Sequence, residues 1–574
     1  MRARLVPLLL VWGQACFEDK PPGDTAGDLP STCEDRDGDG HNNDPCGLDC
    51  DDDNPSVSPD VQEICDSIDD DCDGLVDDDD PSIDTSTYFD WYTDADGDGY
   101  GTDATASSSC DPPSPDSLLE GGDCDDADPD IHPGALEVCD DVDSDCDGDA
   151  DRSCPTPLCG DVSSDTTWGG EPGGYVVTCD ISVTANLTVA PGTTVYFAPD
   201  VGLLVGAGPV GGALIIDAAD DPVTFTSARA AEDSGEVAAP GDWRGVTLDT
   251  FADTSATIRG LQLRYGGRDD GGAGLILRAE TLTLSDSQIC DNLGAGVAVQ
   301  AGATLTLEDS TVCDNSGDGL AALDAALIVR GSVLQGNGGV GLSVAGEGAT
   351  GAVIEDTELS DNGASGLTIT PADALTVFTG NTVTGNGAFP IELDVSDVSA
   401  LDSSSTFSGN TDDRIRIAGD ELDEDSTWAD LDADYLVTER ISVCDSTHTP
   451  LLTIVGGSTV YFDPDTALVI GEISEGALVV SGTAAAPVTF TSEMRTGGVW
   501  RGLSFKSKCF ASSLDYLTIE YGSYNGYFDC ANVTVSDSTF QLSGDTDVTC
   551  TASRGSRAVF TSSTATSNDG CTGI

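Results

Sequence analysis

A short repeat constrains the fold of this 574-residue chain more than any other feature. From Gly160 onward, runs of Val, Leu, Ile and Thr alternate with polar residues and are broken by Gly, Asn and Asp, which is the period-two pattern of strands. Five turns end in Asn at steps of 23, 22, 25 and 24 residues, namely Cys290-Asp-Asn292, Cys313-Asp-Asn315, Gly336-Asn337, Asp361-Asn362 and Gly385-Asn386. Periods of this length indicate stacked units, and a strand-built unit is one coil of a parallel β-helix. Asn tolerates left-handed backbone angles, and its amide can bond the equivalent amide on the next coil.

The strand-rich region also contains a coarser duplication. Tyr175-Val-Val-Thr178 recurs as Tyr435-Leu-Val-Thr438, and Trp243-Arg-Gly245 recurs as Trp500-Arg-Gly502. The segment Pro222-Val-Thr-Phe-Thr-Ser227 recurs unchanged from Pro487. The sequence therefore predicts a first β-helix part over residues 160–424 and a duplicated second part over 425–574. Two separate β-helices and one long helix with a re-initiated segment both remain open.

The cysteine spacing supports the stacked coils. The chain has 20 Cys, a number that favours an oxidising compartment. The pairs Cys290/Cys313, Cys509/Cys530 and Cys550/Cys571 are 23, 21 and 21 residues apart. One coil of chain brings such residues to adjacent rungs, within reach of a disulfide. Without Cys16 the count is odd, and Cys444 is the candidate for an unpaired thiol.

Acidic residues are concentrated near the N-terminus. The chain carries 104 Asp and Glu against 21 Lys and Arg, for a net charge of -83. This charge repels nucleic acid and anionic membranes, so neither is an expected partner. Residues 33–152 contain 42 Asp and Glu but only two Arg. An acidic solubilising surface, as in salt-adapted proteins, would be spread more evenly, so the sequence favours cation sites.

The acidic region, residues 33–159, contains two copies of one repeat whose alternating Asp residues match a calcium loop. Alternate carboxylates converge on one ion, Gly permits the sharp turn, and a carbonyl and a closing acid complete the shell. Hard oxygen donors in this number suit Ca²⁺ better than Zn²⁺ or copper. The most complete loop consists of Asp69, Asp71, Asp73, Leu75 (through its carbonyl), Asp77 and Asp80. The second copy repeats it as Asp143, Asp145, Asp147, Asp149 and Asp151, with Cys154 in the closing place.

Two partial loops precede these. They consist of Asp35, Asp37 and Asp39 with His41 as carbonyl donor, and of Asp94, Asp96 and Asp98 with Tyr100. Asp123, Asp125 and Asp128 are expected to share ions with them. These loops resemble the helix-free calcium loops of thrombospondin type 3 and dockerin modules. The alternative is an acidic disordered spacer.

Each acidic copy carries four cysteines in matching order. They are Cys46, Cys50, Cys65 and Cys72, followed by Cys110, Cys124, Cys139 and Cys146. Two bridges in each copy would stabilise a unit too small and polar to build a core. The loops Cys65–Cys72 and Cys139–Cys146 are the simplest pairings, although connectivity does not follow from sequence.

The N-terminus predicts export. Arg2 and Arg4 precede a short apolar run, and Gly13 and Ala15 suit cleavage before Cys16, so residues 1–15 are read as a signal peptide. Residues 16–32 are read as a flexible tether. Cys16 and the polar stretch after it resemble a bacterial lipoprotein start, which implies a lipid anchor on Cys16; plain secretion is the alternative. No later stretch reaches the ~20 apolar residues that a membrane-spanning helix needs.

Two family resemblances follow from these motifs. The paired Gly-Asp-Cys-Asp-Asp-x-Asp-Pro and Cys-Asp-x-x-Asp-x-Asp-Cys-Asp-Gly blocks resemble the metal-binding repeat of MopE-type bacterial surface proteins. That family carries a copper association, but these residues include no Met or His cluster. The remainder resembles right-handed β-helix proteins of the pectate-lyase-like superfamily. The fold class is therefore all-β, a right-handed parallel β-helix preceded by small disulfide-stapled calcium repeats with little regular secondary structure.

The sequence thus predicts an exported calcium-binding cell-surface protein. Its β-helix is a stalk or a binding face, adhesive or structural, with cell-envelope glycans or surface proteins as possible ligands. The alternative is a calcium-assisted polysaccharide lyase or glycoside hydrolase, because the resembled superfamily includes such enzymes. Asp412-Asp413 and Arg414-Ile-Arg416 faintly resemble polygalacturonase segments, but no Gly-His-Gly is present, and no catalytic residue is assigned.

Overall fold

The chain consists of two compact units, Met1–Pro129 and Asp130–Ile574. The computed structural model describes residues 35–42, 47–115, 117–135, 142–148, 155–171, 173–206, 208–209, 211–231, 237–253, 258–268, 272–419, 421–530, 532–551 and 558–571. The predictions for the signal peptide, the tether, Cys16, Asp149, Asp151 and Cys154 lie outside these ranges. Among the described residues, no helix is both long and apolar enough to cross a membrane.

The N-terminal unit has little regular structure, as predicted. Its strands β1 (Phe89–Thr93), β2 (Ser107–Ser109) and β3 (Ser117–Leu118) form a small antiparallel sheet. Three short 3-10 helices lie in the same unit, η1 (Asp77–Asp79), η2 (Thr85–Thr87) and η3 (Asp103–Thr105). Most of its backbone is therefore held by disulfides and by side-chain hydrogen bonds.

The disulfides of this unit differ from the simplest pairing. Cys72 is bonded to Cys50, and Cys65 is bonded to Cys110. The Cys65–Cys72 loop is therefore wrong, and so is the expectation that each copy closes its own two bridges. Cys65 thus bonds the first cysteine of the second copy, and the Asp78 carboxylate holds the same segment by accepting hydrogen bonds from the backbone N–H groups of Cys110 and Asp111 (3.0 and 2.9 Å). In the second copy Cys146 is bonded to Cys124, so the predicted Cys139–Cys146 loop is wrong as well; Cys139 itself lies outside the described residues.

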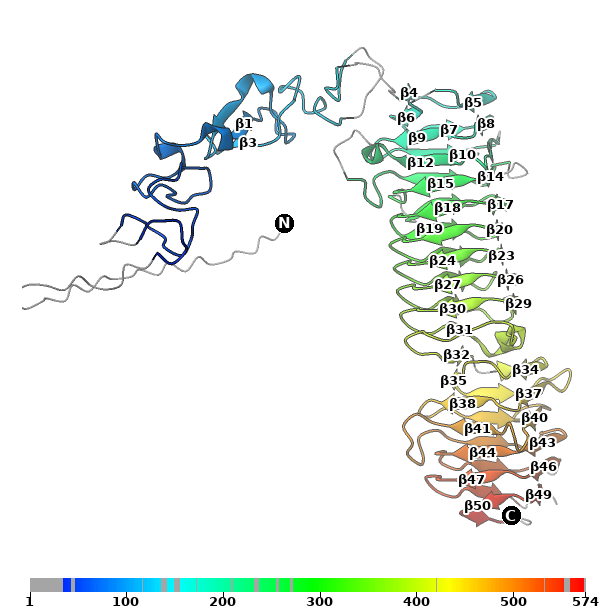
Figure 1. Cartoon of the computed structure of the whole chain (residues 1–574). Coiled ribbons are helices and arrows are strands. Elements are labelled where there is room, and N and C mark those ends of the chain that lie inside the picture. The colour runs from blue at the N-terminus through cyan, green and yellow to red at the C-terminus, as the bar shows by residue number, and fades with distance from the viewer. Residues whose placement is uncertain are drawn as a thin grey trace, which may run out of the picture. The chain divides into compact units, whose positions relative to one another are not determined.

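The C-terminal unit is an all-β parallel solenoid of about 16 turns, which confirms the predicted fold class (Figure 1). In its first part each coil contributes one strand to each of three sheets. The first is a ten-stranded sheet from β4 (Thr156–Leu158) to β30 (Thr382–Thr384), and the second is a 16-stranded sheet. The third is a nine-stranded sheet from β5 (Thr166–Trp168) to β29 (Leu375–Thr379). The second part replaces the ten- and nine-stranded sheets by a seven-stranded sheet, β33 (Glu421–Leu422) to β51 (Asn568–Asp569), and a six-stranded sheet, β34 (Ser426–Trp428) to β49 (Val559–Thr561).

The 16-stranded sheet, called the long sheet, continues through both parts. Its strands are β7 (Ile181–Val183), β10 (Gly202–Val205), β13 (Gly245–Leu248), β16 (Ala273–Leu277), β19 (Ala295–Val299), β22 (Leu320–Leu323), β25 (Leu342–Ala345), β28 (Leu367–Ile369), β31 (Ile391–Asp394), β32 (Ile415–Ala418), β35 (Tyr435–Val437), β38 (Thr459–Phe462), β41 (Val488–Thr491), β44 (Leu517–Glu520), β47 (Thr539–Gln541) and β50 (Thr564–Ala565). Because β31, β32 and β35 pair in succession, the duplication forms one solenoid with a re-initiated segment.

The two copies of the duplicated sequence do not lie on the same face. In the first copy β9 (Thr194–Phe197) belongs to the ten-stranded sheet, whereas its counterpart β38 belongs to the long sheet. The packing inside each copy is kept, because Phe197 stacks on Trp243 at 4.0 Å and Phe462 stacks on Trp500 at 4.1 Å between ring centroids. At the junction the 3-10 helix η5 (Val395–Ala400) replaces a strand next to β29.

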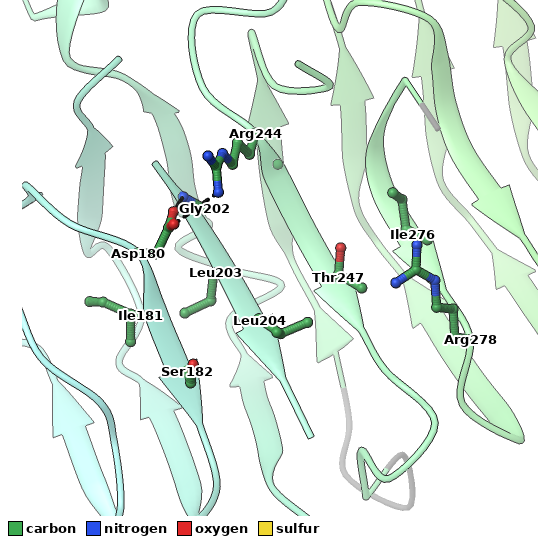
Figure 2. Close-up of a pocket in the computed structure, with 11 residues that line it drawn as sticks. Asp180, Ile181, Ser182, Gly202, Leu203, Leu204, Arg244, Thr247, Ile276 and Arg278 are labelled. Carbon is green, nitrogen blue, oxygen red and sulfur yellow. Dashed lines mark hydrogen bonds and ion pairs between the residues drawn. The ribbon is translucent and has the colours of Figure 1, made fainter. Parts of the chain in front are cut away.

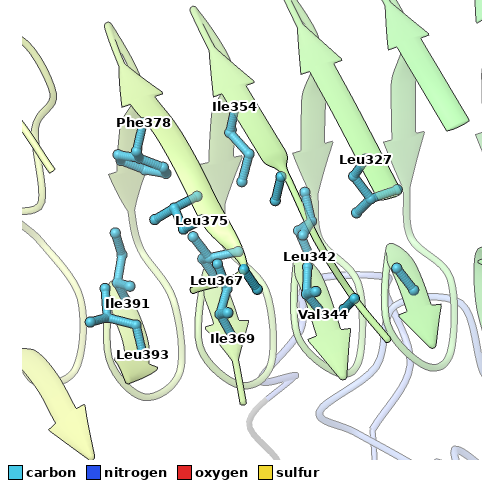
Figure 3. Close-up of a cluster of buried hydrophobic side chains, with 14 of the residues drawn as sticks. Leu327, Leu342, Val344, Ile354, Leu367, Ile369, Leu375, Phe378, Ile391 and Leu393 are labelled. Carbon is cyan, nitrogen blue, oxygen red and sulfur yellow. The ribbon is translucent and has the colours of Figure 1, made fainter. Parts of the chain in front are cut away.

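Alternating side chains fill the solenoid with stacked rows of like residues (Figure 3). One row runs through Leu307, Val329, Ile354 and Phe378, all buried, in strands that pair in register. At one corner the Asn side chains form the predicted ladder. The Nδ2 of each donates to the Oδ1 of the next at 2.8–3.0 Å, along Asn292, Asn315, Asn337, Asn362, Asn386 and Asn410. This amide ladder satisfies buried polar atoms along six consecutive coils.

The three coil-spaced disulfides are confirmed. Cys290 is bonded to Cys313, Cys509 to Cys530, and Cys550 to Cys571. A fourth bridge of the same kind, Cys159–Cys179, was not predicted although its spacing of 20 residues is also one coil. Cys444 is a buried free thiol among the described residues, as expected.

Candidate metal centre

The loop from Asp94 to Tyr100 is folded by its own carboxylates. Asp94 accepts hydrogen bonds from the backbone N–H groups of Gly97 and Gly99 (2.6 and 3.1 Å). Asp98 Oδ1 accepts from Tyr100 N–H at 2.8 Å, and Asp96 Oδ1 accepts from Asp98 N–H at 3.3 Å. Gly97 and Gly99 have φ values of 95° and 104°, which residues with a Cβ rarely adopt. One oxygen of Asp96 and one of Asp98 therefore shape the turn, and the second oxygen of each is buried without a hydrogen-bond partner.

A second segment closes this loop into a cluster of carboxylates. Asp126 Oδ1 accepts from Ala95 N–H at 2.7 Å, and Asp123 is only 3 % exposed. Carboxylate oxygens of Asp94, Asp96 and Asp126 lie within 4.8 Å of one another, and so do those of Asp96, Asp98 and Asp123. Sequence reasoning predicted Asp123 here but missed Asp126. Asp125 and Asp128, which it also named, have exposed side chains, and Asp125 contributes its backbone N–H to Asp123 at 2.9 Å.

The first copy repeats this arrangement with the same hydrogen bonds. Asp35 accepts from Gly38 and Gly40 N–H (2.6 and 3.1 Å), and Asp39 accepts from His41 N–H at 2.8 Å. Asp52 Oδ1 accepts from Arg36 N–H at 3.3 Å, as Asp126 does from Ala95. Asp35, Asp37 and Asp39 offer oxygens within 4.8 Å of one another.

Asp49 occupies the place of Asp123 in the first copy. It is 3 % exposed, and its Oδ1 accepts from Asp51 N–H at 2.9 Å. Asp49, Asp52 and Asp126 were missed, although the matching positions of the two Asp-Cys-Asp-Asp blocks carried the signal.

The loop Asp69–Asp80 forms a further cluster in the first copy. Asp69 accepts from the N–H groups of Asp73 and Gly74 (3.1 and 3.0 Å), and Asp73 Oδ1 accepts from Leu75 N–H at 2.9 Å. Oxygens of Asp69, Asp71 and Asp73 lie within 4.8 Å of one another, and so do those of Glu63, Asp71 and Asp80. Asp143, Asp145 and Asp147 fold their turn with the same hydrogen bonds at 3.0–3.1 Å.

Asp77 and Glu63 bind backbone groups around this loop. Asp77, predicted as a ligand, caps a turn through its Oδ1, which accepts from the N–H groups of Asp66 and Ser67, both at 3.1 Å. Glu63, which was missed, is fully buried, and its two oxygens accept from Asp70 and Asp77 N–H (2.8 and 3.0 Å). Glu63 stands two residues before Cys65, as Glu137 stands before Cys139, which is the only sequence signal for it.

The loops contain buried carboxylate oxygens that have no hydrogen-bond partner. These atoms are the Oδ2 atoms of Asp37, Asp39, Asp49, Asp80, Asp96, Asp98 and Asp123. Burial, with the neighbouring carboxylates adding to it, raises the pKa of Asp37, Asp96, Asp123 and Glu63 above the ordinary range. Buried polar atoms normally have partners, so a set of orphaned carboxylate oxygens that recurs in two copies fits a bound cation.

The donor set also says which kind of cation fits. In the five groups named above, every side-chain donor is a carboxylate. The imidazole of His41 lies 3.2 Å from Asp60 and is outside these groups. Hard carboxylate oxygens suit Ca²⁺ or Mg²⁺, whereas copper and zinc prefer imidazole and sulfur.

The outer face of the solenoid has a hollow over β7, β10, β13 and β16, with a volume of about 470 Å³. Its floor includes Ser182, Leu204, Thr247 and Ile276. Figure 2 shows Arg244 directed toward Asp180, with which it forms an ion pair at 2.8 Å, and Arg278 beside Ile276. Arg278 donates from Nε to Gln300 Oε1 at 3.0 Å and has no ion pair among the described residues. The hollow therefore combines an apolar floor, hydroxyl groups and a positive charge.

The segment that resembles a polygalacturonase motif has a structural role. Arg414 pairs with Asp412 and Glu493 and lies over the ring of Tyr461 at 5.2 Å. This pairing holds the pKa of Asp412 below its usual range. Arg416 pairs with Glu392 on the neighbouring strand. Both arginines therefore join coils on either side of the junction.

Comparisons with known proteins match two parts of the chain. The MopE copper-binding family model, described as "Putative metal-binding motif", matches residues 49–78 and 123–152. The model described as "Right handed beta helix region" matches residues 241–351. No curated protein matches the chain. The solved structure titled "Crystal structure of Agl-KA catalytic domain" aligns with 73% of this chain at 13% identity and a TM-score of 0.21, and the alignment spans 60% of that chain.

The chain thus combines MopE-type metal-binding repeats with a β-helix region, a combination that fits a surface protein. The several disulfides and the MopE-type motif together are typical of an extracytoplasmic protein.

Proposed function

We propose that this chain is an exported calcium-binding protein of the cell surface, in which Ca²⁺ orders the acidic repeats and the β-helix presents a rigid binding face. The observation that carries this proposal is the recurrent set of buried carboxylate oxygens without partners in both copies. A divalent cation removes the mutual repulsion of these carboxylates and supplies the ligand that each orphaned oxygen lacks. Calcium is proposed over copper because the side-chain donors of the five groups described above are all carboxylates.

Native mass spectrometry of the mature protein, after chelation and after addition of Ca²⁺, tests the metal. We expect Ca²⁺ to bind and to protect the repeats against proteolysis, because binding to the folded form alone stabilises that form. Cu²⁺ added in the same amount is expected to leave proteolysis unchanged. A chain that stays metal-free in millimolar Ca²⁺, or whose repeats are digested equally with and without it, would refute the proposal.

We propose that the hollow over β7, β10, β13 and β16 binds a cell-envelope glycan. Its size suits a small number of sugar rings, and Ser182, Thr247 and Arg278 offer hydrogen bonds above apolar side chains. Binding to a panel of glycans is expected to weaken in Arg278→Ala. It should persist in Arg495→Ala, which removes an exposed Arg elsewhere on the solenoid. Equal binding by both variants would exclude this face, and release of unsaturated or reducing ends would favour the enzyme alternative instead.

We propose that Cys16 carries a lipid that anchors the protein, since it follows an apolar run and precedes a polar, Pro- and Gly-containing stretch. The Cys16→Ser variant is expected to move from the detergent phase to the aqueous phase on partitioning. Export is expected to continue if the apolar run still directs it. An unchanged partition would indicate plain secretion.

A further inference from the structure

We propose that the loop Asp94–Tyr100 and the segment Asp123–Asp126 together hold two Ca²⁺ ions that share the carboxylate of Asp96. This inference rests on the proposed function, because it assumes that the repeats bind calcium. It goes beyond that function by assigning the number of ions, the shared ligand and the role of Asp126. The loop Asp94–Tyr100 lies outside the segments that match the metal-binding family, so the centre is completed by residues that the family model does not contain.

The geometry contains two groups of ligands with one member in common. Asp96 lies within 4.8 Å of Asp94 and Asp126 in one group, and of Asp98 and Asp123 in the other. Calcium binds oxygen at about 2.4 Å, so oxygens on one ion lie at most about 4.8 Å apart. Each group meets this condition by itself. A carboxylate has two oxygens and can therefore serve one ion with each.

Each of the two groups that share Asp96 contains further evidence of a ligand site or of close contact between the two segments. Asp123 is 3 % exposed, and its buried Oδ2 has no hydrogen-bond partner. The Oδ2 atoms of Asp96 and Asp98 are orphaned in the same way. In the group with Asp94, Asp126 Oδ1 is 2.7 Å from Ala95 N, which places its carboxylate next to the start of the loop. The two segments are thereby held together even before an ion is considered.

Charge favours two ions over one. The five carboxylates carry five negative charges, so one divalent ion leaves a net charge of minus three in a partly buried site. Two ions leave a charge of minus one. Divalent ions about 3.5–4 Å apart are stable in proteins when carboxylates bridge them, as in other two-metal centres. The first copy has the same five positions, Asp35, Asp37, Asp39, Asp49 and Asp52.

Counting calcium ions in substituted forms of the full mature chain tests this centre. By native mass spectrometry we expect Asp126→Asn and Asp123→Asn each to remove one Ca²⁺ relative to the unsubstituted protein. Asp96→Asn is expected to remove two. The matched control is Asp111→Asn, an exposed Asp of the same unit outside both groups, which should remove none. Loss of only one ion in Asp96→Asn, or of none in Asp126→Asn, would overturn the shared centre while leaving calcium binding intact.

A second measurement covers the case in which a substitution prevents folding. Mn²⁺ replaces Ca²⁺ as the probe, and electron paramagnetic resonance is recorded on the unsubstituted protein. Two ions joined by a carboxylate give a signal broadened by their coupling, whereas isolated ions give the six-line spectrum. We expect the broadened component, its decrease in Asp96→Asn and its full retention in Asp111→Asn. A six-line spectrum alone refutes the pair, and a protein that binds neither metal refutes the proposed function itself.

Discussion

Asp397 is expected to make the stability of the solenoid depend on pH. It lies in η5, at the junction where the nine-stranded sheet ends, and is 2 % exposed. Its Oδ1 accepts from Leu375 N–H at 2.8 Å and so caps the edge of β29, while its Oδ2 is buried without a partner. Burial first, and then the charges of Asp394 and Asp373, raise the pKa of Asp397 to about 7.

The sign of the effect follows from proton binding. The unfolded chain releases this proton near 3.8, whereas the folded chain keeps it until about pH 7. The folded state therefore binds more protons between these values, and the free energy of unfolding falls as pH rises through that interval. A shift of roughly three units at 1.36 kcal/mol each sets the loss at up to about 4 kcal/mol. Above the folded pKa the loss is complete and the curve becomes level.

The substitution Asp397→Asn isolates this term. The amide keeps an oxygen for Leu375 N–H but cannot ionise, so the variant should gain stability over the unsubstituted chain as pH rises. Urea unfolding in constant Ca²⁺, followed by the fluorescence of buried Trp243 and Trp500, measures the difference from about pH 4 to pH 8. Asp545→Asn, at an exposed position, is the control. A difference between Asp397→Asn and the unsubstituted chain that does not change with pH would refute the reasoning.

Three further outcomes are expected. Asn337→Ala removes the side-chain hydrogen bonds of Asn337 with Asn315, Val312 and Asn362 and leaves buried groups unpaired, so the free energy of unfolding at equilibrium should fall by about 3–5 kcal/mol. The control Gln335→Ala, at an exposed position, should change this free energy by less than about 0.5 kcal/mol. Because the pKa values of Asp96 and Asp123 are raised, protons compete with the cation for these carboxylates, and calorimetry should show that Ca²⁺ affinity falls as the pH drops toward these pKa values. A Ca²⁺ affinity that does not change with pH would contradict this reasoning. The double variant Cys65→Ser/Cys110→Ser opens a loop of 45 residues and should lower the unfolding free energy of the N-terminal unit by up to about 4 kcal/mol, whereas intact protease resistance would show that the bridge is dispensable.

The metal loops were predictable to the extent that they are local. Within Asp94–Tyr100, alternation of Asp and Gly is enough to place three carboxylates on one side of a turn. Asp126 and Glu63 come from other segments, and their direction depends on how those segments pack, which no local pattern states. Asp77 shows the opposite limit. It stands at the expected position of the loop, and the pattern did not indicate that its Oδ1 binds the backbone of Asp66 and Ser67 or that its φ is positive, at 51°.

The disulfides show the same division. Cys290 and Cys313 could be paired from sequence because one coil fixes their separation in space. No such period exists in the acidic repeats, where the chain follows its ligands and turns instead of a regular rise. The sequence therefore left the partner of Cys65 open, and in the structure Cys65 bonds Cys110.

The face change at the junction explains why the duplication could be recognised but its placement could not. Strand pairing requires only that backbone groups match and that inward residues meet inward residues, and every face of the coil meets both conditions. Tyr435 can therefore stack on Ile415 of the long sheet although Tyr175, its counterpart, lies in the ten-stranded sheet. The shift leaves the ten- and nine-stranded sheets without continuing strands. Asp432 accepts from Phe407 N–H and Asp397 from Leu375 N–H at these ends, so side-chain carboxylates take the part of the missing strands. The ends of the interrupted sheets thus need side-chain acceptors for their free N–H groups, and this role accounts for a carboxyl group that is buried there despite its cost.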